Sequence, residues 1–202
     1  MRIGVLGGTF DPVHRGHVAL ARAARSELGL ARVLFLPTAR PPHKAGHELA
    51  PALARYAMVE LALLDEPDLW VSPLELDERR TAYAVDSLDR LRREAPDDDY
   101  VLLVGADSLE VFDSWRRWRD LVTGFEIGAL PRAGFERADV LARMTPELRH
   151  AVREARLTWV RGATHPASAT EIRRLLRAGE AAPEGWLDER VLSFLAKYRI
   201  YR

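Results

Sequence analysis

Two histidines three residues apart are the most chemically suggestive feature of the sequence. His14 and His17 stand on either side of Gly16, directly behind the glycine-rich stretch at residues 7–12. Imidazoles at this spacing in the first turn of a helix share one face. Gly16 removes a side chain that would block close approach to them. Two imidazoles above backbone amides suit a phosphate that gains charge during transfer.

The residues around this pair predict the elements that would position it. Residues 3–6 form a short apolar run of the kind found in buried parallel strands. Apolar residues recur at helical spacing from Val18 to Leu28. A strand, a glycine turn and a helix start form an anion site, because free N–H groups and the helix dipole favour negative charge there. A Gly-Gly pair alone is equally compatible with a plain tight turn.

Other candidate residues follow further predicted strands. The strand expected at residues 32–36 leads into a proline-set loop, residues 38–49, in which Lys44 could hold a phosphate as a point charge. The strand at residues 100–104 runs into Gly105 and Asp107, and the carboxylate could accept hydrogen bonds from ribose hydroxyls or cap a helix.

A third cluster lies near the end of the chain. Ser168 or Thr170 can cap the helix that begins there, and Arg173 lies in its first turns. Such a helix start can hold a second phosphate with Arg173 as a bidentate partner. Plain capping beside a surface arginine is the structural alternative.

Strands and helices alternate along the chain, which predicts an α/β fold with a doubly wound parallel sheet. Ligands in such sheets bind beyond the carboxyl ends of the strands, where all the candidate clusters fall. We expect one domain, residues 1–202, with a small C-terminal helical portion from about 165 to 202. The remaining expected strands are 69–71, 125–130 and 157–160, and the remaining expected helices are 51–64, 81–93, 168–178 and 188–198.

Composition limits the classes of function. The 202 residues carry 30 basic and 30 acidic side chains, and a net charge of zero argues against a nucleic-acid-binding surface. The absence of cysteine excludes disulfides and thiolate chemistry. Neither a signal-peptide run nor an apolar stretch of membrane-spanning length is present, so we expect a cytoplasmic protein without a membrane partner.

The string GGTFDPVHRGH at residues 7–17 resembles the signature of the H-x-G-H nucleotidylyltransferase superfamily, and its wording is closest to the bacterial nicotinate-nucleotide adenylyltransferase family. The resemblance implies a Rossmann-like fold and AMP transfer from ATP to nicotinate mononucleotide, with Mg²⁺ carried on ATP and no metal held by the protein alone. It implies catalytic roles for His14, His17, Lys44 and Arg173. It assigns ATP to Gly7, Gly8, Thr9, Phe10, Gly16, Gly105, Asp107, Arg132, Ser168 and Thr170, and the acceptor to Lys44, Tyr83, Ala84 and Trp115.

The sequence departs from the family pattern at several hydroxyl-bearing positions. Ala82 and Ala84 stand in the segment where the family has S-Y-T, and Ala169 replaces one serine of its I-S-S-T-x-I-R motif. Backbone amides near Ala84 can still meet a carboxylate on the substrate ring. The identity of the acceptor is therefore the most open part of the hypothesis.

The sequence leaves two alternatives to AMP transfer onto nicotinate mononucleotide. The acceptor could be nicotinamide mononucleotide or phosphopantetheine instead of nicotinate mononucleotide. The chain could also be a nucleotide-binding regulator that has lost catalysis, which the alanines permit and the intact His14 and His17 oppose. A homo-oligomer is possible on either interpretation.

Overall fold

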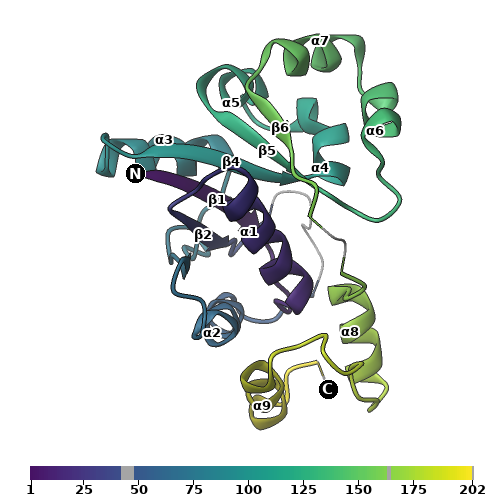
Figure 1. The fold of residues 1–202 in the computed structure, drawn as a ribbon. Coiled ribbons are helices and arrows are strands. Elements are labelled where there is room, and N and C mark those ends of the chain that lie inside the picture. Colours follow the sequence, from purple (N-terminus) through teal and green to yellow (C-terminus); the bar gives the residue numbers. More distant parts are fainter. Residues whose placement is uncertain (42–47, 163–164, 202) are drawn as a thin grey trace.

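The computed structural model describes residues 1–41, 48–162 and 165–201, and these build a six-stranded parallel sheet with helices on both faces (Figure 1). The strand order is β3-β2-β1-β4-β5-β6, so the order reverses between the neighbours β1 and β4. This confirms the predicted doubly wound α/β fold. The strands are β1 (Arg2–Gly8), β2 (Arg32–Pro37), β3 (Leu69–Val71), β4 (Asp99–Gly105), β5 (Glu126–Leu130) and β6 (Leu157–Trp159).

The central strand β4 shows why both faces of the sheet are covered. Its residues Val101 and Leu103 belong to one buried apolar cluster, whereas Leu102 and Val104 belong to the other. Successive side chains of a strand point to opposite faces. A strand with consecutive apolar residues through its middle therefore requires a helical layer on each side.

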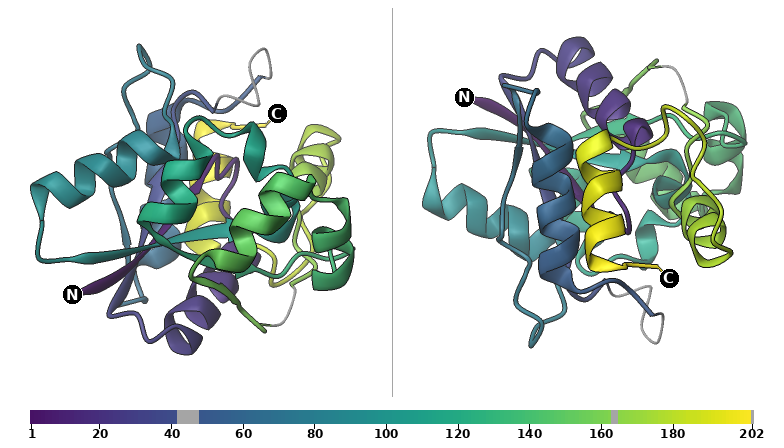
Figure 2. Two further views of the ribbon diagram at one scale, coloured as in Figure 1. Left: turned by 90° about the horizontal axis from the view of Figure 1, so that it is seen from above. Right: turned by 90° about the horizontal axis from the view of Figure 1, so that it is seen from below.

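One face is covered by α1 (Arg15–Glu27), α2 (Ala52–Leu63) and α9 (Glu189–Tyr198), with α8 (Ala169–Arg177) at its edge. Ile172 of α8 and Val191 and Leu195 of α9 are buried in the same cluster as Val18 of α1. Figure 2 shows α9 lying beside α2, although the two helices are far apart in sequence. The C-terminal helices therefore share the core of this face.

The opposite face is covered by a run of shorter helices. They are α3 (Ala84–Glu94), α4 (Ala106–Glu110), the 3₁₀ helix η2 (Phe112–Ser114), α5 (Trp118–Gly124), α6 (Arg137–Arg143) and α7 (Pro146–Glu154). Leu88, Leu109, Leu121, Val140 and Leu148 anchor them in the second apolar cluster.

The sequence analysis places most elements correctly but errs in two regions. The helix expected from residue 81 begins at Ala84, because Tyr83 is an extended N-cap residue with φ of −118°. Helices α5, α6 and α7 were not predicted. The start of α7 carries a recognisable signal, since the Thr145 hydroxyl caps the helix and Pro146 follows at its first position.

Within the described part of the chain, none of the helices combines the length and the apolar character that a bilayer crossing requires.

Candidate active site

The turn after β1 is held by packing of Phe10. This residue has φ of +49°, a left-handed conformation that is uncommon for a bulky side chain. Its ring is buried and lies edge-on to the His17 ring, with centroids 5.2 Å apart. On another side it packs against Phe35 of β2. The apolar contacts of Phe10 therefore fix the path of the chain from β1 to the histidines.

His14 and His17 lie together, as their spacing predicts. His14 is the N-cap of α1, and the two ring centroids are 3.7 Å apart. The His14 amide donates a hydrogen bond to His17 Nδ1 at 3.2 Å, which assigns the proton of a neutral His17 ring to Nε2. Gly16 makes room for the pair, because a Cβ atom at that position would lie 2.9 Å from His14 Nδ1.

The surroundings of His14 keep its imidazole neutral. Burial, followed by the positive charges of His165 and Arg132, lowers the pKa of His14 from 6.5 to about 4. At neutral pH this ring therefore acts as a hydrogen-bonding group rather than as a cation.

The amides at the start of α1 are less available than the sequence analysis expects. The Arg15 amide donates to the Trp186 carbonyl at 2.9 Å, and the His17 amide donates to the His14 carbonyl at 2.9 Å. The expectation of free N–H groups is wrong for these two residues. For Arg15 the physical reason is tertiary, since the segment before α9 packs against the start of α1, whereas the His17 bond is a local turn to the residue three positions earlier.

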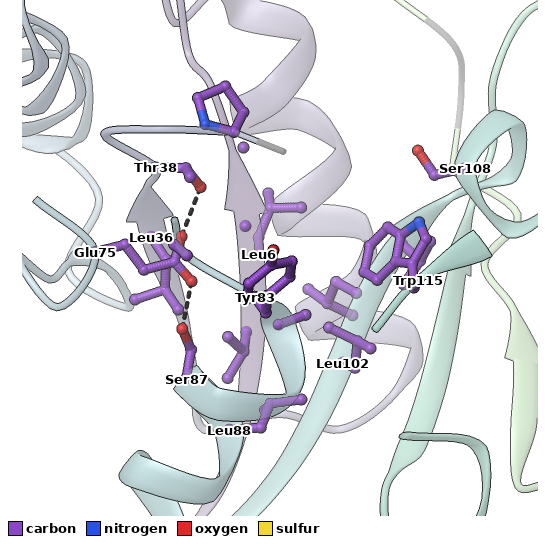
Figure 3. Close-up of a pocket in the computed structure, with 18 of the residues that line it drawn as sticks. Leu6, Leu36, Thr38, Glu75, Tyr83, Ser87, Leu88, Leu102, Ser108 and Trp115 are labelled. Carbon is purple, nitrogen blue, oxygen red and sulfur yellow. Dashed lines mark hydrogen bonds between the residues drawn. The ribbon is translucent and has the colours of Figure 1, made fainter. Parts of the chain in front are cut away.

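A pocket of about 420 Å³ opens at the carboxyl ends of β1 and β4. The reversal of strand order at this place is where open α/β sheets bind ligands. Figure 3 shows Tyr83 and Trp115 among the side chains that line it, together with Leu6 and Leu102. The pocket brings together residues predicted for two different ligands, namely Gly7, Gly8, Thr9, Gly105, Asp107, Tyr83, Ala84 and Trp115.

The two aromatic side chains of the pocket are held differently. The Trp115 ring is half-buried and packs on Phe112, with centroids 4.8 Å apart. Tyr83 has the Arg116 guanidinium 4.8 Å from its ring centroid, a cation–π contact. Trp118, three residues further on, is buried in the core.

A buried carboxyl group, Glu75, also lines the pocket and was not among the candidate residues. The hydroxyls of Thr38 and Ser87 each donate to it at 2.6 Å (Figure 3). Burial raises the pKa of Glu75, while the two hydrogen bonds oppose this shift. Glu75 thereby ties the end of β2 to α3.

Asp107 and Arg132 meet at the end of the sheet. Asp107 Oδ1 accepts from the Ser108 amide at 3.0 Å, and its Oδ2 lies 3.6 Å from Arg132 Nε. The N-cap of α4 is Gly105, so the N-cap alternative for Asp107 is wrong. Both side chains remain partly exposed, and such a pair contributes little to stability. Asp107 is one of the residues that line the pocket, and Arg132 lies next to it through this ion pair.

The third cluster reaches the same site through Arg173. Its Nη1 donates to the Asp11 carbonyl at 2.7 Å, which ties α8 to the turn after β1. Ser168 is the N-cap of α8, but its hydroxyl makes no capping hydrogen bond within the described ranges. Thr170 is exposed, with its hydroxyl 3.5 Å from Arg173 Nη2. Lys44 lies outside the described residues.

Three further residues around the turn escaped the sequence analysis: Asp11, Arg55 and Tyr201. Arg55 gave one signal, because a charged residue stands among the apolar positions of a predicted helix. Asp11 stands in the string that resembles the superfamily signature, but no feature of the sequence marked Asp11 or Tyr201 as functional. All three are buried or half-buried, and Arg55 and Tyr201 contact the turn that precedes the histidines.

Comparison with known proteins agrees with this geometry. The model of the cytidylyltransferase-like family matches residues 5–175. A probable nicotinate-nucleotide adenylyltransferase of Herpetosiphon aurantiacus is 39% identical over 202 residues, covering 99% of this chain and 98% of that protein. One of Symbiobacterium thermophilum is 37% identical over 204 residues, covering 99% and 95%.

A solved structure with a similar fold also carries an adenylyltransferase name. The nicotinic acid mononucleotide adenylyltransferase of Plasmodium falciparum, complexed with NaAD, superposes with a TM-score of 0.79. The two chains are 15% identical, and the match covers 99% of this chain and 97% of the other. With the family model and the full-length relatives, this leads to one assignment: the chain belongs to the cytidylyltransferase-like family and, within it, to the nicotinate-nucleotide adenylyltransferases.

Proposed function

We propose that the protein transfers the AMP part of ATP to nicotinate mononucleotide and releases pyrophosphate. The product is nicotinate adenine dinucleotide, an intermediate of NAD synthesis. The observation that carries the proposal is the pocket at the reversal of strand order, which joins the turn after β1 to Tyr83, Ala84 and Trp115. The names of the full-length relatives support the choice of acceptor.

The reaction needs no nucleophile from the protein. An oxygen of the acceptor's 5′-phosphate forms a bond to the α-phosphorus of ATP. The bond from that phosphorus to the bridging oxygen breaks, and pyrophosphate leaves with the electron pair. The protein contributes position and charge stabilisation.

The histidine pair is proposed to act on the α-phosphate. His17 would donate from Nε2, since its Nδ1 accepts from the His14 amide. His14, whose pKa is lowered to about 4, would supply a hydrogen bond without a permanent charge. Donors aimed at developing charge lower the barrier because they need no reorganisation. Lys44 and Arg173 are proposed to hold the phosphates.

The remaining ATP contacts are proposed along the ends of β1, β4 and β5. Asp107 would accept from the ribose hydroxyls, and Arg132 beside it would face the phosphates. The glycine-rich turn, with Thr9 and Phe10, and the start of α8, with Ser168 and Thr170, would complete the nucleotide site.

The acceptor would bind between α3 and Trp115. Trp115 is proposed to stack on the pyridine ring, beside Tyr83. Ala84 opens α3, and the amides of Asp86 and Ser87 donate to the Tyr83 carbonyl at 3.0 and 3.1 Å, so the amides of Ala84 and Val85 are the ones proposed for the ligand. A ring carboxylate can bind such amides whether or not the side chain carries a hydroxyl, so Ala84 would serve this purpose.

Mg²⁺ is proposed to arrive with the triphosphate. Groups of three or more His, Asp or Glu side chains that could hold a metal do not occur in residues 1–41, 48–162 and 165–201. This donor set suits an ion bound mainly by phosphate oxygens and water, as is usual for Mg²⁺. In that role the ion would neutralise the phosphates.

We also propose that residues 1–202 act as one domain. Ile172, Val191 and Leu195 of the C-terminal helices are buried in the same apolar cluster as residues of α1 and β2. A portion that shares its core with the sheet has no separate core on which to fold.

A single assay tests the proposed reaction. The purified protein is supplied with ATP, Mg²⁺ and one acceptor at a time: nicotinate mononucleotide, nicotinamide mononucleotide or phosphopantetheine. We expect the fastest pyrophosphate release with nicotinate mononucleotide. Faster release with another acceptor would reassign the substrate, and no release with any acceptor would overturn the proposal.

A further inference from the structure

The turn that carries the histidines has a buried carboxylate at its centre. Asp11 is 2% exposed, and its Oδ1 accepts from the Ala50 amide at 3.1 Å and from the Tyr201 hydroxyl at 2.5 Å. Its carbonyl accepts from Arg173, whose Nε also lies 4.0 Å from Asp11 Oδ2. One residue of the turn is therefore bonded to three distant parts of the chain.

Tyr201 reaches Asp11 from beyond the end of α9. The chain leaves α9 through Arg199 at φ of +51°, and Tyr201 itself has φ of +66°. Left-handed conformations are unfavourable for such side chains and persist where surrounding contacts hold them. Burial and the hydrogen bond to Asp11 raise the pKa of Tyr201, so its hydroxyl stays protonated and donates.

Arg55 fixes the same turn from the side of α2. Its side chain is 1% exposed and donates to four main-chain carbonyls: Thr9 and Thr38 at 2.7 Å, Ala50 at 2.9 Å and Ala39 at 3.2 Å. Burial lowers the pKa of Arg55, and the negative charge of Asp11 is the largest opposing influence. Arg55 and Asp11 thus compensate each other electrostatically while each binds the turn.

These contacts join the turn after β1 to helix α2 and to the C-terminal segment. Arg55 holds Thr9, Tyr201 holds Asp11, and His14 follows three residues later. The Arg55 guanidinium and the Tyr201 hydroxyl are both costly to order, since each group must be desolvated and immobilised. Both side chains contact the turn before the histidines, Arg55 at the Thr9 carbonyl and Tyr201 at the Asp11 carboxylate.

We propose that Tyr201 and Arg55 are positioning residues for adenylyl transfer: through Asp11 and Thr9 they hold the turn that presents His14 and His17 to the phosphate. This inference rests on the proposed function. Neither side chain is proposed to touch the substrate. Through the contact of Tyr201 with Asp11, the C-terminal segment helps to hold the site in its active geometry.

The decisive variant is Tyr201→Phe in the full-length chain, which removes one oxygen atom and keeps the ring. We expect kcat to fall about ten- to a hundredfold, because a small displacement of reacting groups has effects of this size. The acceptor's KM should stay within about twofold, since Tyr83 and Trp115 are untouched, and the melting temperature should move by no more than about 4 °C. The matched control is Tyr198→Phe, on exposed Tyr198 of α9, which should leave kcat, KM and the melting temperature unchanged.

A second variant tests Arg55 in the same assay. Arg55→Lys keeps the charge but loses the fork that binds several carbonyls at once, so kcat should fall while the acceptor's KM holds. If both residues act through the one turn, the double variant should lose less than the product of the two single losses. Should Arg55→Lys fail to fold, Tyr201→Phe decides the proposal alone.

Binding of ATP without acceptor separates this inference from the proposed reaction. By calorimetry, Tyr201→Phe should weaken ATP binding whether or not turnover occurs with a given acceptor. Normal kcat and normal ATP affinity in an active Tyr201→Phe protein would overturn the positioning role and leave the proposed function standing. A wild-type protein that is inactive with every acceptor would instead overturn the function, and the ATP affinities would still decide whether Tyr201 holds the turn.

Discussion

At the scale of single residues, the site depends on two imidazoles with different environments. His14 is buried beside His165 and Arg132, whereas His17 is half-buried and packs edge-on against Phe10. The spacing in the sequence brings the rings together, whereas their different surroundings come from tertiary packing. The two histidines are therefore expected to respond differently to substitution.

Substituting His17 should affect chemistry far more than folding. We expect His17→Ala to lower kcat about 10²- to 10³-fold, the usual loss when one donor to a developing charge is removed. The free energy of unfolding should fall by only about 1–2 kcal/mol, because the contacts with the Phe10 and His14 rings are lost. Steady-state kinetics and urea unfolding check both values, with exposed His150→Ala of α7 as the control. Near-normal turnover of His17→Ala would remove the residue from the mechanism.

Lowering the pH should destabilise the fold through His14. The unfolded imidazole takes up a proton near pH 6.5 but the folded one only near pH 4, so between these values the unfolded state binds more protons. The stabilisation is fully present above pH 6.5 and is lost as the pH falls toward 4, up to an order of 3 kcal/mol.

Urea unfolding at pH 7, 5.5 and 4.5 measures this contribution. His14→Gln has no titrating group at the position, so the difference in unfolding free energy between wild type and variant should shrink as the pH falls. His150→Gln is the control and should follow the wild type. A difference that is constant over this pH range would show that His14 titrates normally.

At the scale of elements, α8 is the clearest case of a helix placed for function. Its N-cap residue Ser168 makes no capping hydrogen bond in the described part of the chain. Arg173 of the same helix donates a hydrogen bond to the carbonyl of Asp11, which is 162 residues earlier in the sequence. Because that contact crosses from α8 to the turn after β1, it joins the two proposed phosphate-binding elements.

The arginines of α8 should therefore differ sharply. Arg173→Ala is expected to lower kcat/KM for ATP by about 10- to 100-fold, as the loss of a charged hydrogen bond would. Arg174→Ala is the control: Arg174 is exposed and pairs with Glu171 on the surface, so its effect should be about twofold or less. If both variants lowered kcat/KM for ATP by the same small factor, Arg173 would have a structural role and would not bind ATP.

At the scale of the whole molecule, the sheet divides two apolar clusters, and the C-terminal helices complete one of them. Leu195 of α9 is 3% exposed within that cluster, whereas Leu192 on the same helix is 39% exposed. The C-terminal portion also delivers Tyr201 and the Trp186 carbonyl to the site. Stability and site geometry are thus coupled through α9.

The core position should carry the stability. We expect Leu195→Ala to lower the unfolding free energy by about 2–4 kcal/mol, and Leu192→Ala by no more than about 0.5 kcal/mol. Both proteins should unfold in a single transition when followed by circular dichroism and by tryptophan fluorescence. Two separate transitions, with only one shifted by Leu195→Ala, would contradict the proposal of one domain.

Local patterns predicted much of this fold because they depend on near neighbours. The alternating order of elements led to the doubly wound sheet. The end of the fourth strand led to Gly105 and Asp107, the family resemblance led to Tyr83 and Trp115, and all four line one pocket. Short helices such as α5 and α6 were missed, since their few apolar positions repeat too briefly to form a pattern.

The sequence by itself determined that two imidazoles share the start of a helix behind a glycine-rich strand end, because residues three apart meet whatever the rest of the chain does. Only the tertiary structure decided that Tyr201 bonds to Asp11, that Arg55 binds four carbonyls, and that the His14 pKa is lowered. These properties arise from burial and from groups up to 190 residues apart in sequence. Chain packing sets such distances, and no local spacing encodes them.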